Sequence, residues 1–165
     1  MYISFNGKIT PADQPVLLTS NRGYRYGDGL FETMKLDKGV ILLEELHFQR
    51  LLNGLELLKF DLPKLFSTSK LAEAIIQLAE KNQVLELGRV RLSLFRGNGG
   101  LYDADRTVQY LIECWPLPDS FSRLNENGLE IGIYPDARKQ VDLFSGLKSA
   151  NFLPYTMASL YAKEN

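Results

Sequence analysis

The alternation of apolar and polar residues near the start of the chain predicts two β-hairpins. Residues 2–9 alternate around Asn6-Gly7, a dipeptide that favours a two-residue hairpin turn. A second pair of strand-like runs, at residues 30–36 and 40–43, is joined by Asp37-Lys38-Gly39. Because both connections are this short, each pair of strands is expected to be antiparallel.

The apolar spacing then changes to that of amphipathic helices. The first predicted helix covers residues 44–58, and the second runs from Pro63 to about Asn82. The apolar positions with helical spacing are Leu46, Leu51, Leu52, Leu55 and Leu58 in the first helix, and Leu65, Leu71, Ile75, Leu78 and Ala79 in the second.

Two longer strands are predicted after these helices, at residues 87–95 and 106–115, with a glycine-rich turn at 96–100 between them. Alternation in the first strand puts Val90, Leu92 and Leu94 on one face, and Arg89, Arg91 and Ser93 on the other. Strands that surround two helices predict an α+β domain over residues 1–115.

A domain boundary is predicted after residue 115, where two prolines and several polar residues follow. We place a linker at 116–125 and the start of a second domain at 126–165. This second part contains a predicted strand at 129–134 and a final amphipathic helix that runs to Asn165. It is too short to close a core of its own, so the predicted architecture is an α+β domain followed by an incomplete second domain.

Composition excludes several classes of protein. The 165 residues are 45% apolar and 24% charged, which is ordinary for a globular domain and unlike a disordered chain. The 19 Lys and Arg residues against 20 Asp and Glu residues leave no basic excess for nucleic acid. The chain has no membrane-spanning apolar run, no signal-like N-terminus and one cysteine, Cys114. We expect no nucleic-acid or membrane partner, a cytoplasmic location, and a buried structural role for Cys114.

The residues that could carry chemistry are few. His47 is the only histidine and lies in a predicted helix, where a packing role is favoured, and no zinc-ligand spacing is present. Glycine-rich segments at 23–29 and 96–100 permit close approach of the backbone to a ligand, or form plain turns. Arg89 and Arg91, on one strand face, suit an anionic small molecule, although exposed ion pairs explain them equally well.

Lys148 lies between a loop and the start of the last predicted helix, which Ser149 or Asn151 can cap and in whose first turn Pro154 fits. A lysine at a helix N-terminus faces the positive end of the helix dipole, which disfavours the ammonium form. A neutral amine is what Schiff-base chemistry requires.

Together these motifs resemble one family. The segment from Asn21 to Thr33, His47-x-x-Arg50-Leu51, Arg96-Gly-x-Gly-Gly100 and Lys148-x-x-Asn151 occur here in the order typical of the fold-type IV pyridoxal-phosphate enzymes, the class IV aminotransferases. The resemblance implies the fold of D-amino acid aminotransferase, a homodimer, and a chain lacking most of the second domain. It also implies that pyridoxal 5'-phosphate is bound by Lys148 as a Schiff base and by Arg50 at its phosphate. Phe31, Glu32 and the 96–100 loop would then surround the substrate, with its carboxylates on Arg91 or Arg96.

Departures from the family patterns separate its subtypes. The 96–100 loop lacks the histidine of D-amino acid aminotransferases, and Phe152 stands near the position where branched-chain enzymes have a tyrosine. Leu92 follows Arg91 where those enzymes tend to have proline. The resemblance therefore favours a 4-amino-4-deoxychorismate lyase of folate biosynthesis, which releases pyruvate and 4-aminobenzoate. A branched-chain or D-amino acid aminotransferase is the alternative, and a non-catalytic paralogue that binds an anionic ligand, or an inactive fragment, is the second.

Overall fold

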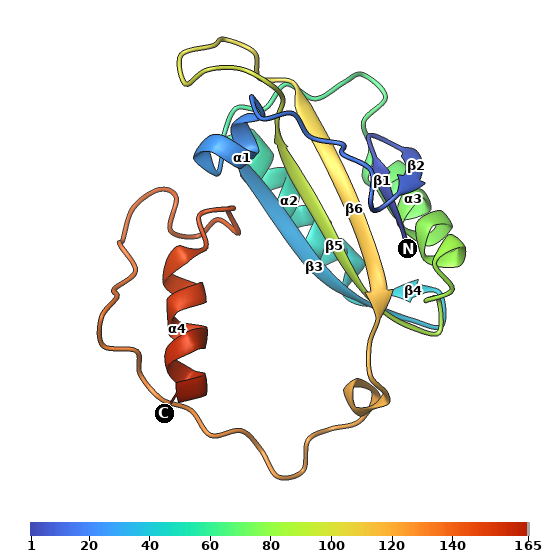
Figure 1. Ribbon diagram of the computed structural model, residues 1–165, viewed down its shortest axis with the longest axis vertical. Helices are drawn as coiled ribbons and strands as arrows, with labels where there is room; N and C mark the ends of the chain where they lie inside the picture. The colour runs from blue at the N-terminus through green and yellow to red at the C-terminus, as the bar shows by residue number, and fades with distance from the viewer. Residues whose placement is uncertain (165) are drawn as a thin grey trace.

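The computed structural model describes residues 1–164 and contains a six-stranded sheet with two helices on one face (Figure 1). The elements in chain order are β1 (Tyr2–Phe5), β2 (Lys8–Pro11), α1 (Arg22–Tyr26), β3 (Gly29–Asp37), β4 (Val40–Ile41), α2 (Glu44–Leu57), α3 (Thr68–Lys81), β5 (Leu87–Arg96), β6 (Val108–Pro116), the 3₁₀ helix η1 (Asp119–Ser122) and α4 (Leu153–Glu164). This arrangement confirms the predicted α+β class.

The sheet is antiparallel throughout, with the strand order β2-β1-β6-β5-β3-β4. Strands β3 and β5 pair along their length, from Gly29 opposite Phe95 to Asp37 opposite Leu87. Directly paired residues share a face of an antiparallel sheet. Glu32, opposite Leu92, therefore lies on one face, while Phe31, opposite Ser93, lies on the other.

Both predicted hairpins are present. Asn6 and Gly7 have φ values of 49° and 84°, and Lys38 and Gly39 have 49° and 76°. Positive φ at both turn residues matches the twist of the flanking strands, and this explains why the Asn-Gly pair is so informative in the sequence.

The hydrophobic core lies between the sheet and the helices α2 and α3 (Figure 1). The predicted apolar face of β5, Val90, Leu92 and Leu94, is fully buried there. Leu51 and Leu55 of α2, and Leu71, Ile75 and Leu78 of α3, pack into the same cluster. Each such side chain contributes roughly 1.5–3 kcal/mol by burial, so this layer holds β3 and β5 in place.

Helix α3 begins later than predicted. The structure starts it at Thr68 rather than at Pro63, because the Ser67 side chain caps it by accepting a hydrogen bond from the Lys70 amide (3.3 Å). Leu65, one of the apolar positions assigned to this helix from its spacing, lies in the preceding loop and is 75% exposed.

The chain leaves the sheet after Pro116, and the predicted strand at 129–134 is absent. Leu129, Ile131 and Ile133 are 84%, 91% and 89% exposed, and no strand in the described part of the chain offers this segment a hydrogen-bonding partner. Alternation alone does not form a strand without a neighbouring strand to pair with.

The final helix, α4, stands off from the sheet on the β3 side (Figure 1), and its predicted end at Asn165 lies outside the described residues. None of the helices in residues 1–164 is both long and apolar enough to cross a membrane.

Cys114 is fully buried in the core, as predicted, and burial raises the pKa of its thiol to about 12. Because the thiolate is the reactive form, we expect alkylation at pH 8 only when the protein is unfolded. The free energy of unfolding should also fall as the pH rises from 9.0 toward about 12, since the unfolded chain loses a proton that the folded chain keeps. Mass spectrometry with and without denaturant measures the first effect, and a flatter pH dependence in Cys114→Ala measures the second. Equal alkylation rates in the two states would contradict this interpretation.

Candidate functional site

Lys148 is held against the open edge of β3. The amide of Phe31 donates to the Lys148 carbonyl (3.0 Å), and the amide of Ala150 donates to the Gly29 carbonyl (2.9 Å). Ser149 forms an antiparallel bridge with Leu30 between them. Strand β4 pairs only with the far end of β3, at Leu36 and Asp37, so this edge is free to receive the 148–150 segment.

This placement corrects the predicted position of Lys148 at a helix start. Helix α4 begins at Leu153, and its first turn is closed by the Thr156 amide, which donates to the Phe152 carbonyl (3.0 Å). Residues 148–150 are held in extended pairing by β3, so they cannot also form the first helical turn. The argument from the helix dipole therefore does not apply to Lys148, and neither Ser149 nor Asn151 caps the helix.

The Lys148 ammonium lies beside an aromatic side chain that also contacts an arginine. Its Nζ is 4.8 Å from the ring centre of Phe31, and the Arg91 Cζ is 4.0 Å from the same ring. Phe152 meets Phe31 edge-on at 5.1 Å, and Phe31 is only 4% exposed. The structure thus brings together three predicted site residues, Phe31, Arg91 and Lys148, with two cations around one ring.

Glu32 points to the opposite face of β3, where two side chains of α2 meet it. Arg50 donates from Nε to Glu32 Oε1 (2.7 Å) and from Nη2 to Oε2 (2.5 Å), and His47 Nδ1 lies 2.8 Å from Oε2. The Glu32 side chain is 1% exposed, whereas that of Arg50 is 49% exposed. The hydrogen bond from Arg50 to Glu32 raises the pKa of the guanidinium above its ordinary value, against the lowering effect of burial. Arg50 is therefore a fixed positive charge at the surface, held from behind by a buried carboxylate.

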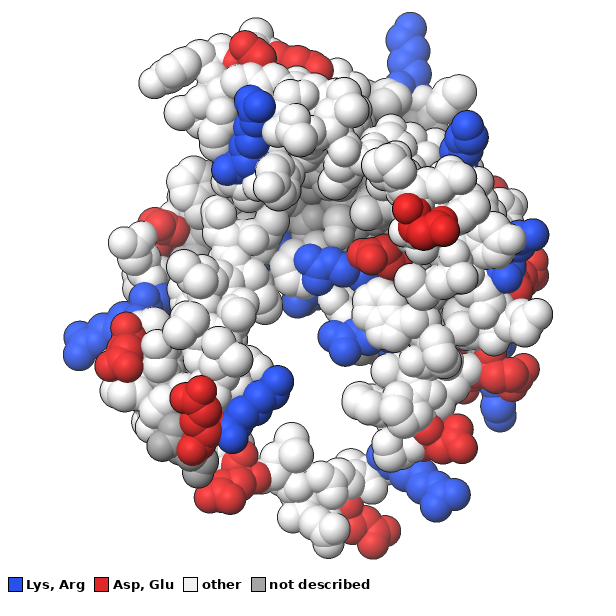
Figure 2. All heavy atoms as spheres, viewed as in Figure 1, with Lys and Arg blue, Asp and Glu red and all other residues white. Residues whose placement is uncertain are grey.

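Arg50 and Lys148 border neighbouring spaces between α2 and the 146–148 segment. A hollow of about 320 Å³ is lined by Leu46, Gln49, Arg50, Asn53, Gly54, Leu57, Gly146 and Leu147. A narrower space shares Arg50, Gly54 and Leu147 with the hollow and is also lined by Phe31, Glu32 and Lys148. Figure 2 shows that the molecule is open between the sheet and the segment that carries α4, with basic side chains on the rim of the opening. Arg50 lines both spaces, and Lys148 lines the narrower one. An amine and a guanidinium that border one space suit a ligand that is both electrophilic and anionic.

Arg96, predicted to contact substrate, lies at the end of β5 in a separate network of polar contacts. Its Nη1 donates to Asp28 Oδ1 (2.5 Å), its Nη2 donates to the Leu58 carbonyl, and its guanidinium lies 4.3 Å from the Phe60 ring centre. The side chain is 11% exposed. The structure does not bring Arg96 into contact with Lys148, Phe31 or Arg91.

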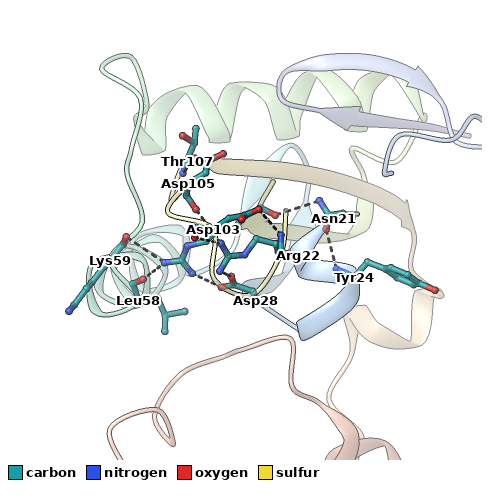
Figure 3. A network of polar contacts seen from close by, with 11 residues as sticks. Asn21, Arg22, Tyr24, Asp28, Leu58, Lys59, Asp103, Asp105 and Thr107 are labelled. Atoms are coloured by element: carbon teal, nitrogen blue, oxygen red, sulfur yellow. Dashed lines mark hydrogen bonds and ion pairs between the residues drawn. The ribbon is translucent and has the colours of Figure 1, made fainter. Parts of the chain in front are cut away.

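The same network ties down the glycine-rich loop after β5 (Figure 3). Arg22 Nη2 lies 3.0 Å from Asp28 Oδ2, and Arg22 Nη1 donates to the Asp103 carbonyl (2.9 Å). The Arg22 amide donates to the Gly97 carbonyl (2.9 Å). Asp28 is not among the site residues predicted from the sequence. Its position between Gly27 and Gly29, in the motif that also contains Arg22 and Arg25, is the signal that could have identified it. Within residues 1–164, no cluster of His, Cys, Asp and Glu is suited to a metal ion.

Comparison with known proteins identifies the family. The model of the family described as amino-transferase class IV matches residues 29–165. The chain belongs to the class IV aminotransferases. This confirms the family resemblance of its motifs, and with it membership of a group of pyridoxal-phosphate-dependent aminotransferases and lyases.

Individual relatives differ in activity. The chain is 26% identical to a D-alanine aminotransferase of Bacillus licheniformis, over 99% of this chain and 56% of that protein. The structure of 4-amino-4-deoxychorismate lyase from Pseudomonas aeruginosa is 27% identical and superposes with a TM-score of 0.77, over 96% of this chain and 56% of the other. Branched-chain amino acid aminotransferase from Escherichia coli shares the fold, with a TM-score of 0.62 at 24% identity over 70% of this chain and 40% of that one. The chain thus spans about half the length of the curated relatives it matches.

Proposed function

We propose that the protein binds pyridoxal 5'-phosphate through Lys148 and Arg50 and acts on an amino acid-like substrate. The observation that carries this proposal is that the two residues, from segments far apart in the sequence, border one narrow space of about 10 Å³, which shares Arg50 and Leu147 with the hollow of about 320 Å³. The donor set fits the cofactor, because an amine condenses with an aldehyde and a guanidinium matches a phosphate. The aldehyde and pyridine ring of the bound cofactor supply the electron sink for breaking bonds at the substrate carbon.

The chain's own residues would orient the reactants and move the proton. Lys148 Nζ is the base that takes the proton from the substrate carbon and returns it, since it is the amine beside the Phe31 ring and the Arg91 guanidinium there stays protonated. Phe31 is buried and excludes water from beneath the amine. Arg91, on the same ring, offers its guanidinium to a substrate carboxylate. We assign this role to Arg91 rather than Arg96, because Asp28 and the Leu58 carbonyl occupy Arg96.

For the substrate we propose 4-amino-4-deoxychorismate, cleaved to pyruvate and 4-aminobenzoate. Gly99 to Leu101 provide no histidine for a D-amino acid carboxylate, and Phe152 presents a ring without a hydroxyl to Phe31. The likeness to the solved lyase over nearly the whole chain supports this choice. The leucine that follows Arg91, where branched-chain enzymes tend to have proline, does not help to separate the subtypes, since Leu92 is buried on the helix-covered face. A homodimer, inferred from the family resemblance, and a cytoplasmic location, expected from the sequence, complete the proposal.

Transamination is the second candidate, favoured by the identity to D-alanine aminotransferase over most of the chain. The cofactor-loaded protein is expected to release pyruvate from aminodeoxychorismate, measured with lactate dehydrogenase, at a higher kcat/KM than it converts D-alanine or valine to keto acids. Higher efficiency with either amino acid would replace the lyase assignment with an aminotransferase. A protein that forms no borohydride-stable adduct with pyridoxal 5'-phosphate would contradict both activities.

A further inference from the structure

The Glu32 carboxylate lies in an apolar layer and receives three hydrogen-bond donors. It is on the face of β3 that α2 covers, opposite Leu92, and only 1% of its side chain is exposed. Arg50 supplies two of the donors and His47 the third. Since an ionised carboxylate only accepts, His47 is a donor here in the form that carries a proton on Nδ1. A buried carboxylate is tolerated when it is paired in this way.

The pairing determines where the Arg50 guanidinium points. Its Nε and Nη2 are engaged by Glu32, and among the described residues none accepts a hydrogen bond from Nη1. The side chain is half exposed and lines the hollow of about 320 Å³ beside Gly146 and Leu147. A long arginine side chain otherwise has many rotamers, and a bidentate contact to a fixed carboxylate selects one of them.

We propose that Glu32, held by His47, is a positioning residue that orients Arg50 for the cofactor phosphate. This inference rests on the proposed function of Arg50. It gives Glu32 a role that requires no contact with substrate, in keeping with its burial on the face opposite Phe31. A phosphate then meets a guanidinium whose orientation is already set, and binding does not have to order that side chain.

For the Glu32→Gln variant, the proposal predicts a change in affinity for pyridoxal 5'-phosphate that is opposite in direction to the change that charge alone would cause. Replacing Glu32 with Gln removes a negative charge beside the phosphate site, so the electrostatic effect alone would tighten anion binding. Loss of the fixed Arg50 orientation should instead weaken pyridoxal 5'-phosphate binding, by about fivefold on the usual cost of ordering one long side chain. Binding of pyridoxal, which lacks the phosphate, should not change.

The test compares dissociation constants for pyridoxal 5'-phosphate and pyridoxal in wild type, Glu32→Gln and Arg50→Ala. Glu45→Gln is the matched control, because it removes the same charge from an exposed position in the first turn of α2. Glu32→Asp keeps the charge but draws the carboxylate back from Arg50, so it provides the same measurement if Glu32→Gln does not fold. The inference is supported if the preference for the phosphorylated ligand falls in the Glu32 variants and not in Glu45→Gln.

Three results would overturn the inference, and they can be told apart. If Arg50→Ala lowers the preference for the phosphorylated ligand but the Glu32 variants keep it or increase it, Arg50 binds phosphate without help from Glu32. If Arg50→Ala itself leaves the preference unchanged, the phosphate role of Arg50 is wrong, and the positioning role is lost with it. Equal weakening of both ligands by a Glu32 variant would indicate a general structural role and would also count against the proposal.

Discussion

Replacing Asp28 with alanine is expected to lower the free energy of unfolding by about 3 kcal/mol, as for other broken buried ion pairs. Asp28 is the carboxylate that faces both Arg22 and Arg96, whose side chains are 10% and 11% exposed. Without it, two guanidinium groups remain close together in a largely buried site. The carbonyls of Leu58 and Asp103 accept hydrogen bonds from them but do not balance their charge.

Denaturant unfolding measures this effect, and Asp37→Ala is the matched control. Asp37 pairs with Lys35 at 3.9 Å with both side chains about one-third exposed, so its loss should cost less than about 1 kcal/mol. The Asp28→Ala protein should also be cut more readily by proteases in residues 97–107, because Arg22 anchors this loop. Equal stability of the two variants would show that the network contributes no more than an exposed ion pair.

The sequence predicts those parts of the fold that local spacing determines. Asn6-Gly7 and Lys38-Gly39 identify the hairpins because few residues tolerate positive φ at two successive positions. Val90, Leu92 and Leu94 identify the buried face of β5 because the period of a strand leaves no other assignment. Leu71, Ile75 and Leu78 identify the core side of α3 for the corresponding reason in a helix.

The errors arise where distant segments determine the conformation. Residues 129–134 alternate like a strand but form no ladder with any strand of residues 1–164. Lys148 precedes a helical pattern, yet hydrogen bonds with Phe31 and Gly29, more than a hundred positions earlier, hold its segment extended. The candidate site also depends partly on local sequence and partly on distant segments. Its motifs identify Lys148 and Arg50, but the residues next to them in the sequence do not indicate that the two border one space, or that Arg96 belongs to the Asp28 network.

Replacing Lys148 with alanine is expected to abolish the covalent cofactor adduct. Borohydride reduction of wild type with pyridoxal 5'-phosphate should leave one pyridoxyl group on the peptide that contains Lys148, detected by mass spectrometry. The variant should carry none, because Lys148 is the lysine that contacts the Phe31 ring and borders the narrow space with Arg50.

The Lys148→Ala variant separates covalent attachment from binding. The Lys148 amine contacts the rings of Phe31 and Phe152 at 4.8 and 6.0 Å, weak contacts whose loss should change stability by at most about 1 kcal/mol. The fold and the Arg50 phosphate site should therefore survive, so that equilibrium dialysis still finds weaker, reversible binding of the cofactor. Lys64→Ala, which removes an exposed lysine from the loop before α3, is the control and should keep the adduct. An undiminished adduct in Lys148→Ala, or a label mapped to another lysine in wild type, would show that the Schiff-base assignment is wrong even though the family is established.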